Sequence, residues 1–261
     1  FNDGVESTML YLKNGFDLQM KLNAKEFDET IVYEGKGAKE NNFLAKNALY
    51  EEGFDYDSAL AADEPVFKKI MADKKQTDLE RLKKAGLEPA FVALHEKTIE
   101  QNANGLQEYY NENLAIKKLN NTPAPSFEYE NYKGKTTKLE DLRGKFVYID
   151  VWATWCGPCR AEIPHLKDVE KKFHNKNIEF VSISIDTKKD YEKWRKFVAE
   201  KELGGIQLFA DNDWNSLFVK ELGITGIPRF ILIDPKGTIL NANADRPSSP
   251  KLVEVLEGLV K

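Results

Sequence analysis

The sequence has only two cysteines in 261 residues, and only two residues separate them. A fold held together by disulfides needs several bridges between distant loops, so this class of scaffold is excluded. A zinc site usually needs four ligands, and His165 and His174 do not follow the spacing of zinc-binding histidine pairs. We therefore expect no metal, and the chemistry of the pair rests on the two sulfurs themselves.

The sequence also lacks an excess of charge of one sign and a long apolar run. It has 38 basic and 43 acidic residues, for a formal net charge of −5. This balance gives no electrostatic reason to expect nucleic acid or an anionic membrane surface as a partner. No apolar run approaches the roughly 18 residues of a membrane-spanning helix. The hydrophobic content of 41% is nevertheless enough to form a core.

The N-terminal part is expected to begin with strands. Asn14-Gly15 is a strong hairpin signal between the short runs 7–12 and 16–22. Apolar and polar residues alternate in the second run, as in a half-buried strand. Residues 30–33 offer a third strand.

From about residue 38 to residue 119 the pattern changes to helix. Glu64-Pro65 opens one segment with apolar residues on one face, and Pro89 opens another. Prolines and turn-forming residues then interrupt both helix and strand at 120–126. We place the domain boundary there, with an N-terminal domain at 1–119 and a second domain at 120–261.

In the second domain, strands and helices alternate. Residues 146–152 form a continuous apolar run broken only by Asp150, which is typical of a strand buried on both faces. The other expected strands are 127–131, 136–138, 178–185, 206–210, 229–234 and 238–241. Helices are expected up to about residue 173, at 191–202, at 214–222 and from residue 249. This order predicts an α/β fold with helices around a mixed sheet.

The two cysteines lie in Trp155-Cys156-Gly157-Pro158-Cys159, directly after the predicted strand 146–152. Cys156 is therefore expected at the N-terminus of the next helix, where free backbone N–H groups and the helix dipole favour a thiolate. A lowered thiol pKa gives more of the nucleophilic form at neutral pH. One helical turn brings the two sulfurs within bonding distance, and Pro158 suits that first turn.

This motif resembles the active site of thioredoxin, and the similarity extends beyond it. Asp150 stands where thioredoxins keep a buried carboxylate, and Pro164 where a proline kinks their active-site helix. Gly226-Ile227-Pro228 matches the segment that carries their cis-proline. The resemblance implies a thioredoxin-like fold, preceded here by a smaller β-then-α-helical region.

Other features are similar to the TlpA/ResA branch of that family. They are the long span between Cys159 and Pro228, which holds an extra helix, and the segment 139–145 after the first hairpin of the domain. The resemblance covers residues 122–261. The N-terminal region resembles, less specifically, the extension that precedes this domain in exported proteins of Bacteroidetes.

The thiol chemistry assigns a role to each cysteine. Cys156 is the nucleophile that forms a mixed disulfide with a substrate, and Cys159 resolves it. No cofactor is expected beyond the redox-active Cys156–Cys159 disulfide. Asp150 is a candidate base for Cys159, because burial raises the pKa of a carboxyl group. Glu162, which matches a glutamate of ResA-type proteins, is the second candidate, and could equally be a solvent-facing helix residue.

The predicted substrate surface comprises Trp155, Pro158, Ile227, Pro228 and Arg229. The resemblance implies a cis Ile227–Pro228 bond that turns the backbone of Ile227 towards the dithiol, where an extended substrate segment could pair. Trp155 is expected at the rim. Arg229 could lower the pKa of Cys156, select acidic partners or point to solvent.

The function expected is that of a protein-disulfide reductase, because the Gly-Pro pair between the cysteines is the thioredoxin version. Two alternatives are a peroxiredoxin-like peroxidase and a non-catalytic binding module that uses the N-terminal helices. Peroxiredoxins place a threonine three residues before the reactive cysteine, whereas this sequence has Ala153 there.

The expected location is the periplasm or cell envelope. The chain starts at Phe1 without a signal peptide, which fits a removed leader or a lipid anchor upstream. Scarcity of cysteine also fits an oxidising compartment. The expected partners are protein disulfide or dithiol clients and a membrane electron donor.

Overall fold

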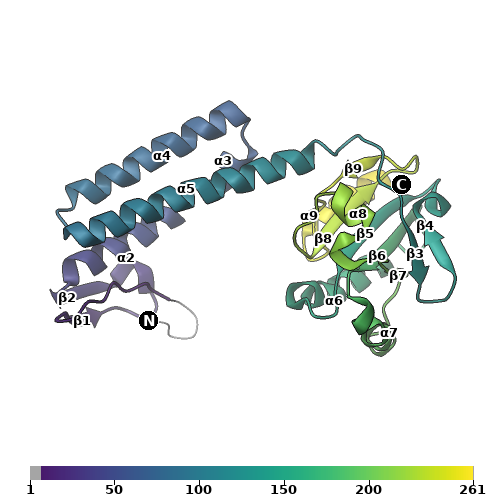
Figure 1. Ribbon diagram of the computed structural model, residues 1–261, viewed down its shortest axis with the longest axis horizontal. Coiled ribbons are helices and arrows are strands. Elements are labelled where there is room, and N and C mark those ends of the chain that lie inside the picture. Colours follow the sequence, from purple (N-terminus) through teal and green to yellow (C-terminus); the bar gives the residue numbers. More distant parts are fainter. Residues whose placement is uncertain (1–6, 261) are drawn as a thin grey trace. The chain divides into compact units, whose positions relative to one another are not determined.

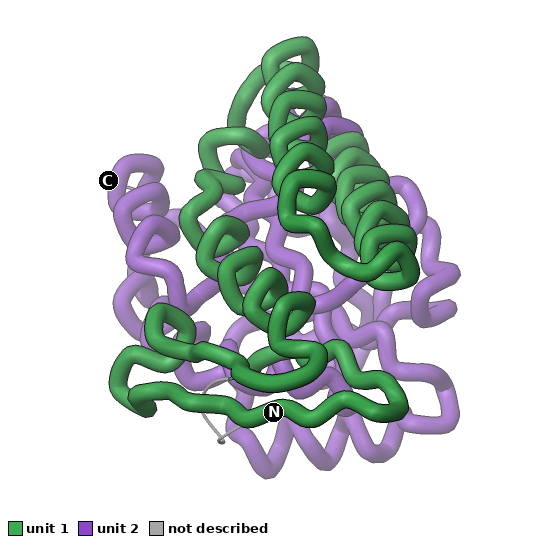
Figure 2. The backbone as a smooth tube through the Cα atoms, turned by 90° about the vertical axis from the view of Figure 1, so that its left-hand side faces the viewer, with its two compact units in different colours: residues 1–111 green, residues 112–261 purple. Residues whose placement is uncertain are grey.

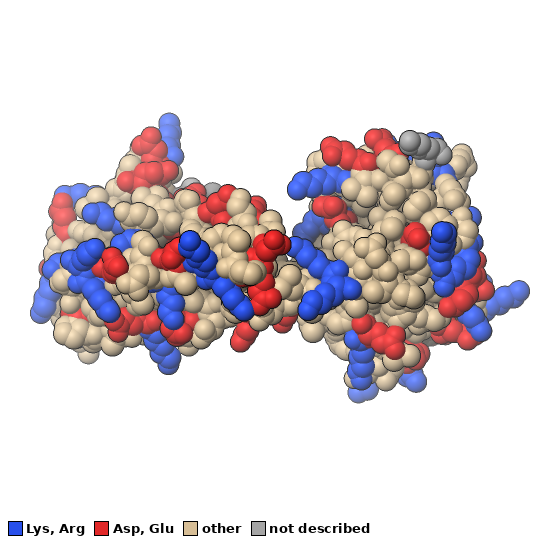
Figure 3. Space-filling view, turned by 90° about the horizontal axis from the view of Figure 1, so that it is seen from above, with Lys and Arg blue, Asp and Glu red and all other residues tan. Residues whose placement is uncertain are grey.

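The computed structural model describes residues 7–260, which divide into two compact units (Figure 2). Unit 1 comprises residues 1–111 and unit 2 residues 112–261. The domain boundary predicted between residues 119 and 120 is not tested by this division into compact units, and it stays a prediction. On the face shown in Figure 3, basic and acidic side chains are interspersed on each unit.

Unit 1 contains a two-stranded antiparallel sheet, followed by helices. Strand β1 (Asp17–Lys21) pairs with β2 (Val32–Lys36), and the short helix α1 (Phe27–Thr30) connects them. A small core of Phe27, Ile31, Tyr33 and Ala45 joins this sheet to the first long helix. The predicted order, strands first and helices after, is confirmed.

The hairpin predicted around Asn14-Gly15 is wrong in its pairing. The turn exists, since the Phe16 N–H donates to the Lys13 carbonyl at 3.1 Å, but residues 8–13 form no strand. The side chain of Asn41 takes the place of a partner strand: its Oδ1 accepts from the Tyr11 N–H at 2.9 Å, and its Nδ2 donates to the Tyr11 carbonyl at 3.0 Å. A helix side chain thus satisfies the backbone of Tyr11, and β1 pairs with β2.

Four helices follow β2 in the chain, and the last of them continues past the end of unit 1. They are α2 (Ala38–Glu52), α3 (Tyr56–Ala61), α4 (Glu64–Lys84) and α5 (Pro89–Lys117). The starts predicted at Glu64 and Pro89 are confirmed. A stacked pair of rings, Phe67 of α4 and Tyr110 of α5, lies 3.8 Å apart between centroids. No helix among residues 7–260 is long and apolar enough to cross a lipid bilayer.

Unit 2 is built on one seven-stranded mixed sheet in the order β4-β3-β7-β6-β5-β8-β9 (Figure 1). The strands are β3 (Glu128–Asn131), β4 (Thr136–Lys138), β5 (Phe146–Trp152), β6 (Ile178–Ser184), β7 (Ile206–Phe209), β8 (Arg229–Ile233) and β9 (Ile239–Asn241). The three strands β5, β6 and β7 run parallel, and the other pairs are antiparallel. All seven strands were predicted to within one or two residues.

The helices of unit 2 cover both faces of this sheet. They are α6 (Gly157–Lys172), α7 (Tyr191–Glu200), α8 (Leu217–Glu221) and α9 (Pro250–Leu259), with short 3-10 turns at Leu139–Leu142, Lys188–Asp190 and Asp213–Asn215. Side chains of α6 and α9 share one core with one face of the sheet. Those of α7 and α8 share the other core. The predicted fold class, a thioredoxin-like mixed sheet flanked by helices and preceded by a β-then-helix region, is confirmed.

The segment predicted as a linker is tied to the sheet of unit 2. The Asn121 N–H donates to the Ile239 carbonyl at 2.7 Å, and the Ile239 N–H donates to the Thr122 carbonyl at 2.9 Å. The Ala124 N–H donates to Gly237 at 2.9 Å. These bonds attach the segment to β9 and to the residues just before it. The segment therefore lies along the edge of the sheet before the chain reaches β3.

Candidate active site

The two cysteines lie where the central strand β5 ends and helix α6 begins. They form a disulfide with Cα atoms 5.3 Å apart. Both side chains are buried. Cys156 is the N-cap of α6, and Cys159 lies in its first turn. The predicted placement of Cys156 at a helix N-terminus is therefore confirmed.

The first turn of α6 directs backbone N–H groups at Cys156. The Cys159 N–H donates a hydrogen bond to Cys156 Sγ at 3.1 Å. Within α6, which the structure describes in full, the first turn has no acidic residue. The positive end of the helix dipole is therefore not offset there, and it stabilises negative charge on Cys156 Sγ once the disulfide is reduced.

The segment around Pro228 lies against the disulfide. The Ile227–Pro228 peptide bond is cis, as the resemblance implied. The carbonyl oxygen of Ile227 lies 3.8 Å from Cys156 Sγ. Main-chain groups of this segment are therefore in contact with the sulfur that begins the predicted chemistry.

An apolar rim borders the buried sulfurs. Trp155, just before Cys156, is 50% exposed, and its ring lies 6.5 Å from that of Trp214 between centroids. Pro158, between the cysteines, is also exposed. A protein segment that reaches Cys156 would therefore meet large apolar side chains, which supply contact area at binding surfaces.

Arg229 is half-buried at the start of β8, where it pairs with Val151 of β5. It lines a surface hollow of about 260 Å³ together with Glu112 and Glu221. Neither cysteine lines this hollow. The predicted influence of Arg229 on Cys156 or on acidic partners stays a prediction.

A buried aspartate, Asp186, holds the loop that leads to Cys156. Its Oδ2 accepts from the Thr154 N–H at 2.9 Å, and its Oδ1 accepts from the Thr154 hydroxyl at 2.7 Å. The Ser184 hydroxyl donates to Oδ2 at 2.7 Å. Three donors thus satisfy one buried carboxylate, which couples the end of β6 to the loop before α6.

Asp150 lies on β5, buried beneath α6. Its Oδ1 has no hydrogen-bond partner among the described protein atoms. Burial raises the pKa of Asp150 to about 8, and the negative charges of Glu162 and Glu170 add to this rise. This is the direction predicted from the position of Asp150 in an apolar strand.

Glu162 is also buried, so the alternative of a solvent-facing helix residue is wrong. The Ser248 N–H donates to its Oε2, and the Ser248 hydroxyl donates to its Oε1, each at 2.9 Å. Arg246 Nη1 lies 3.7 Å from Oε1. Both carboxylate oxygens of Glu162 are thus occupied, and they fix the segment before α9 to α6.

Three residues of this neighbourhood were not predicted from the sequence: Asp186, Trp214 and Ser248. A signal existed for Asp186, which directly follows the predicted strand 178–185. Carboxyl ends of parallel strands meet at one edge of a sheet, so the strand order could have placed this residue beside the cysteine motif, but the prediction was not made. Trp214 and Ser248 come from segments distant in sequence, and no pattern marked them.

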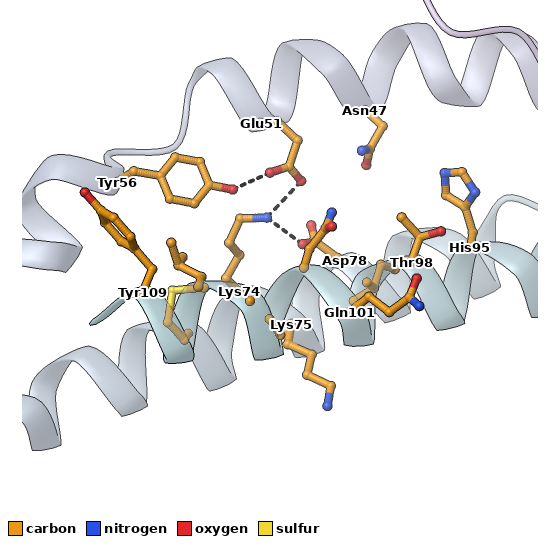
Figure 4. Close-up of a pocket in the computed structure, with 16 residues that line it drawn as sticks. Asn47, Glu51, Tyr56, Lys74, Lys75, Asp78, His95, Thr98, Gln101 and Tyr109 are labelled. Carbon is orange, nitrogen blue, oxygen red and sulfur yellow. Dashed lines mark hydrogen bonds and ion pairs between the residues drawn. The ribbon is translucent and has the colours of Figure 1, made fainter. Parts of the chain in front are cut away.

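A second cavity lies wholly within unit 1, bordered by α2, α4 and α5 (Figure 4). Its volume is about 430 Å³. The Lys74 ammonium group lies between the carboxylates of Glu51 at 2.8 Å and Asp78 at 2.7 Å, and the Tyr56 hydroxyl donates to Glu51. These charges are paired with one another, and we assign the cavity no chemistry. Among the described residues, no cluster of three or more His, Cys, Asp or Glu side chains could hold a metal ion.

Comparison with known proteins places this site in a family. The family model described as Redoxin matches residues 119–256. The thiol-disulfide oxidoreductase ResA of Bacillus thuringiensis subsp. konkukian is 28% identical over 134 residues, which cover 51% of this chain and 75% of the relative. ResA of Bacillus subtilis is 28% identical over 118 residues, which cover 45% of this chain and 63% of the relative.

Solved structures also match the second half of the chain. The solution structure of a protein from Bacteroides vulgatus, described as a candidate thiol-disulfide oxidoreductase, is 48% identical, with a TM-score of 0.47. The match covers 53% of this chain and 89% of that one. The family model and the ResA relatives confirm the predicted TlpA/ResA-type resemblance.

Replacing Asp150 with Asn should change the pH dependence of stability. A raised carboxyl pKa means that the folded state binds a proton more tightly than the unfolded state. The contribution of Asp150 to stability is therefore complete below about pH 4 and is lost as the pH rises towards 8, by up to about 1.4 kcal/mol per pH unit. Asp150→Asn should be more stable than wild type at pH 8, and this advantage should shrink as the pH falls.

Urea unfolding between pH 4 and pH 9 measures this difference. All four tryptophans belong to unit 2, so tryptophan fluorescence follows that unit. Asp168→Asn, an exposed acid on α6, is the matched control. A stability difference between Asp150→Asn and wild type that stays constant over this range would contradict the raised pKa.

Proposed function

Because the chain belongs to the Redoxin family, whose model matches residues 119–256, we propose that it is a thiol-disulfide oxidoreductase that reduces protein disulfides. The observation that carries the proposal is the Cys156–Cys159 pair at the N-cap of α6, with the Cys159 N–H on Cys156 Sγ. The names of the ResA relatives support the same class of reaction.

The reaction begins with the reduced dithiol. The thiolate of Cys156 attacks one sulfur of a client disulfide, the client S–S bond breaks, and its other sulfur leaves as a thiolate. Cys159 then gives up its proton and attacks Cys156 Sγ. The mixed disulfide breaks, the client leaves reduced, and the Cys156–Cys159 bond forms. Two electrons pass from the protein to the client.

The proton of Cys159 needs an acceptor, and the two carboxylates differ in what they offer. Both oxygens of Glu162 already accept hydrogen bonds from Ser248. Asp150 has a free Oδ1 and a pKa raised to about 8 by burial. A base works best when its pKa is near the working pH. We therefore assign the proton of Cys159 to Asp150 and a positioning role to Glu162.

The client is expected to bind along the cis-proline segment. An extended peptide can add main-chain hydrogen bonds beside Ile227, while Trp155, Pro158 and Pro228 contact its side chains. The Ile227 carbonyl, 3.8 Å from Cys156 Sγ, sets where the client disulfide must lie. Arg229 directly follows Pro228, and we propose that its charge favours acidic client segments.

The resemblance supports the proposed direction of the reaction and the proposed location of the protein. The Gly157-Pro158 pair is the version found in reducing thioredoxins. The scarcity of cysteine fits an oxidising compartment, so we place the protein in the periplasm or cell envelope. Its electrons must then come from a membrane donor. Fractionation of the source cells that finds it only in the cytosol would reject this location.

Cys159→Ser should trap the mixed disulfide. With oxidised insulin as a model client, this variant should form a covalent adduct through Cys156, because the resolving sulfur is absent. Wild type should reduce insulin and release it, and Cys156→Ser should form no adduct. Non-reducing electrophoresis and mass spectrometry detect the adduct. Adduct formation by Cys156→Ser, or none by Cys159→Ser, would reverse or remove the assigned roles.

The reduction potential tests the direction. Equilibration with glutathione buffers at pH 7 should give a potential more negative than about −230 mV, in the range of reducing thioredoxins. Mass spectrometry after alkylation measures the oxidised fraction. A value of about −180 mV or higher belongs to isomerases and oxidants, and it would overturn the reducing direction while leaving thiol-disulfide exchange intact.

A further inference from the structure

A row of polar side chains crosses the middle of an otherwise apolar sheet. Asp150 of β5 is paired with Ser182 of β6, and Ser182 is paired with Gln207 of β7. All three are buried. Paired residues on parallel strands project to the same face, so the three side chains form a row on the face of the sheet that α6 covers.

The row borders a cavity with space for about one water molecule. The cavity has a volume of about 10 Å³, and α6 closes it from above with Ile163 and Leu166. Three of its lining residues carry a buried polar atom without a partner among the described protein atoms: Asp150 Oδ1, Trp152 Nε1 and Gln207 Oε1. Two acceptors and one donor around such a space suit a bound water.

Glu170, on the third turn of α6 after the cysteines, also lines the cavity. It also lines a surface hollow of about 630 Å³ that opens to solvent, as do Lys167 and Gly204. A Cβ atom on Gly204 would lie 2.2 Å from Glu170 Oε2, so the glycine lets the carboxyl group lie against the backbone. The Gln207 amide donates to the Gly204 carbonyl at 2.8 Å. This bond links the last residue of the row to the backbone that lies against Glu170.

We propose that the row and its cavity form a proton path, with Glu170 as the group that passes the proton between Asp150 and solvent. The proposal rests on the proposed function, because the proton it carries is the one that Cys159 gives up. The need for such a path is physical. Cys159 is only 2% exposed, so its proton needs a route through the protein to solvent whatever the size of the disulfide that Cys156 attacks.

The steps balance in protons. Cys159 S–H gives its proton to the Asp150 carboxylate, and the Cys159 thiolate attacks Cys156. Protonated Asp150 then gives that proton to the cavity water, which passes one of its own to the Glu170 carboxylate. Glu170 releases it to solvent in the surface hollow. Asp150 ends ionised, and no electron moves in these steps.

The acidities of the two carboxyl groups fit this order. Burial raises the pKa of Glu170 to about 7, against a smaller opposing effect of Lys167, and the pKa of Asp150 is about 8. A transfer between groups of such similar pKa costs little free energy. Asp150 faces Glu162 and Glu170. The charged and titratable groups around Glu170 in the surface hollow are Lys145, Lys167, Lys171, His174, Lys176, Glu179 and Glu202.

Reaction of the reduced protein with 5,5′-dithiobis(2-nitrobenzoate) separates the two chemical steps. The thiolate of Cys156 releases one thionitrobenzoate as it forms the mixed disulfide, and the attack of Cys159 releases the second. Stopped-flow absorbance between pH 5 and pH 9 resolves the phases. Glu170→Gln should slow the second phase by about tenfold at pH 7 and shift its pH profile, and the first phase should stay within about twofold.

Two further variants separate a path from a simple charge effect. Ser182→Val fills the cavity with an apolar group yet keeps every charge, and valine suits a strand. It should slow the second phase as Glu170→Gln does. Asp168→Asn, an exposed acid on the same helix, should change neither phase. Circular dichroism verifies that each variant is folded.

The outcomes distinguish the proton path, the role of Glu170 as its exit and the resolving role of Cys159. Slowing by Glu170→Gln but not by Ser182→Val would mean a charge effect and overturn the path. Slowing by Ser182→Val alone would reject Glu170 as the exit, and no slowing by either would reject the path altogether. A wild-type protein that shows no second phase would instead remove the resolving role of Cys159, and with it the proposed function on which this inference rests.

Discussion

The hydrogen bond from the Cys159 N–H to Cys156 Sγ, 3.1 Å long, is the contact on which the rest of the site depends. It exists because the chain leaves a buried strand and enters a helix within a few residues, so that a cysteine occupies the N-cap. A helix N-terminus offers N–H groups without internal partners, together with the positive end of the dipole. A sulfur placed there is stabilised as an anion, and an anion is what thiol-disulfide exchange requires.

The surrounding structure keeps that contact in place from two sides. Asp186, at the end of the neighbouring strand, binds both the N–H and the hydroxyl of Thr154 and so fixes the loop before Cys156. The cis-proline segment brings the carbonyl of Ile227 to the same sulfur. The two buried acids near α6 have different surroundings. Glu162 is saturated with hydrogen bonds, whereas Asp150 is left with an unpartnered oxygen.

The sequence predicted the parts of this arrangement that depend on local pattern. The apolar run Phe146–Trp152 gave β5 with its observed bounds, and the buried carboxyl within that run predicted the direction of the Asp150 pKa. The cis bond before Pro228 followed from resemblance alone. Each of these features is encoded within a few adjacent residues.

The features that failed or were missed depend on contacts distant in the sequence. Residues 7–12 had a hairpin pattern, but the amide of Asn41 binds the backbone of Tyr11 in place of a partner strand, and no local rule predicts that competition. Likewise, Asp150, Ser182 and Gln207 form a row only because of the register of three strands. A shift of one residue in any strand would point its member to the opposite face.

The most direct measurement of the central claim is the titration of Cys156 in the reduced protein. Thiolate absorbance at 240 nm, followed from pH 4 to pH 10 with Cys159→Ser to isolate the single sulfur, gives its pKa. The account predicts a pKa below about 7.5, well under the roughly 8.5 of a free thiol. A value at or above that of a free thiol would show that the start of α6 does not stabilise the anion, and it would contradict the account.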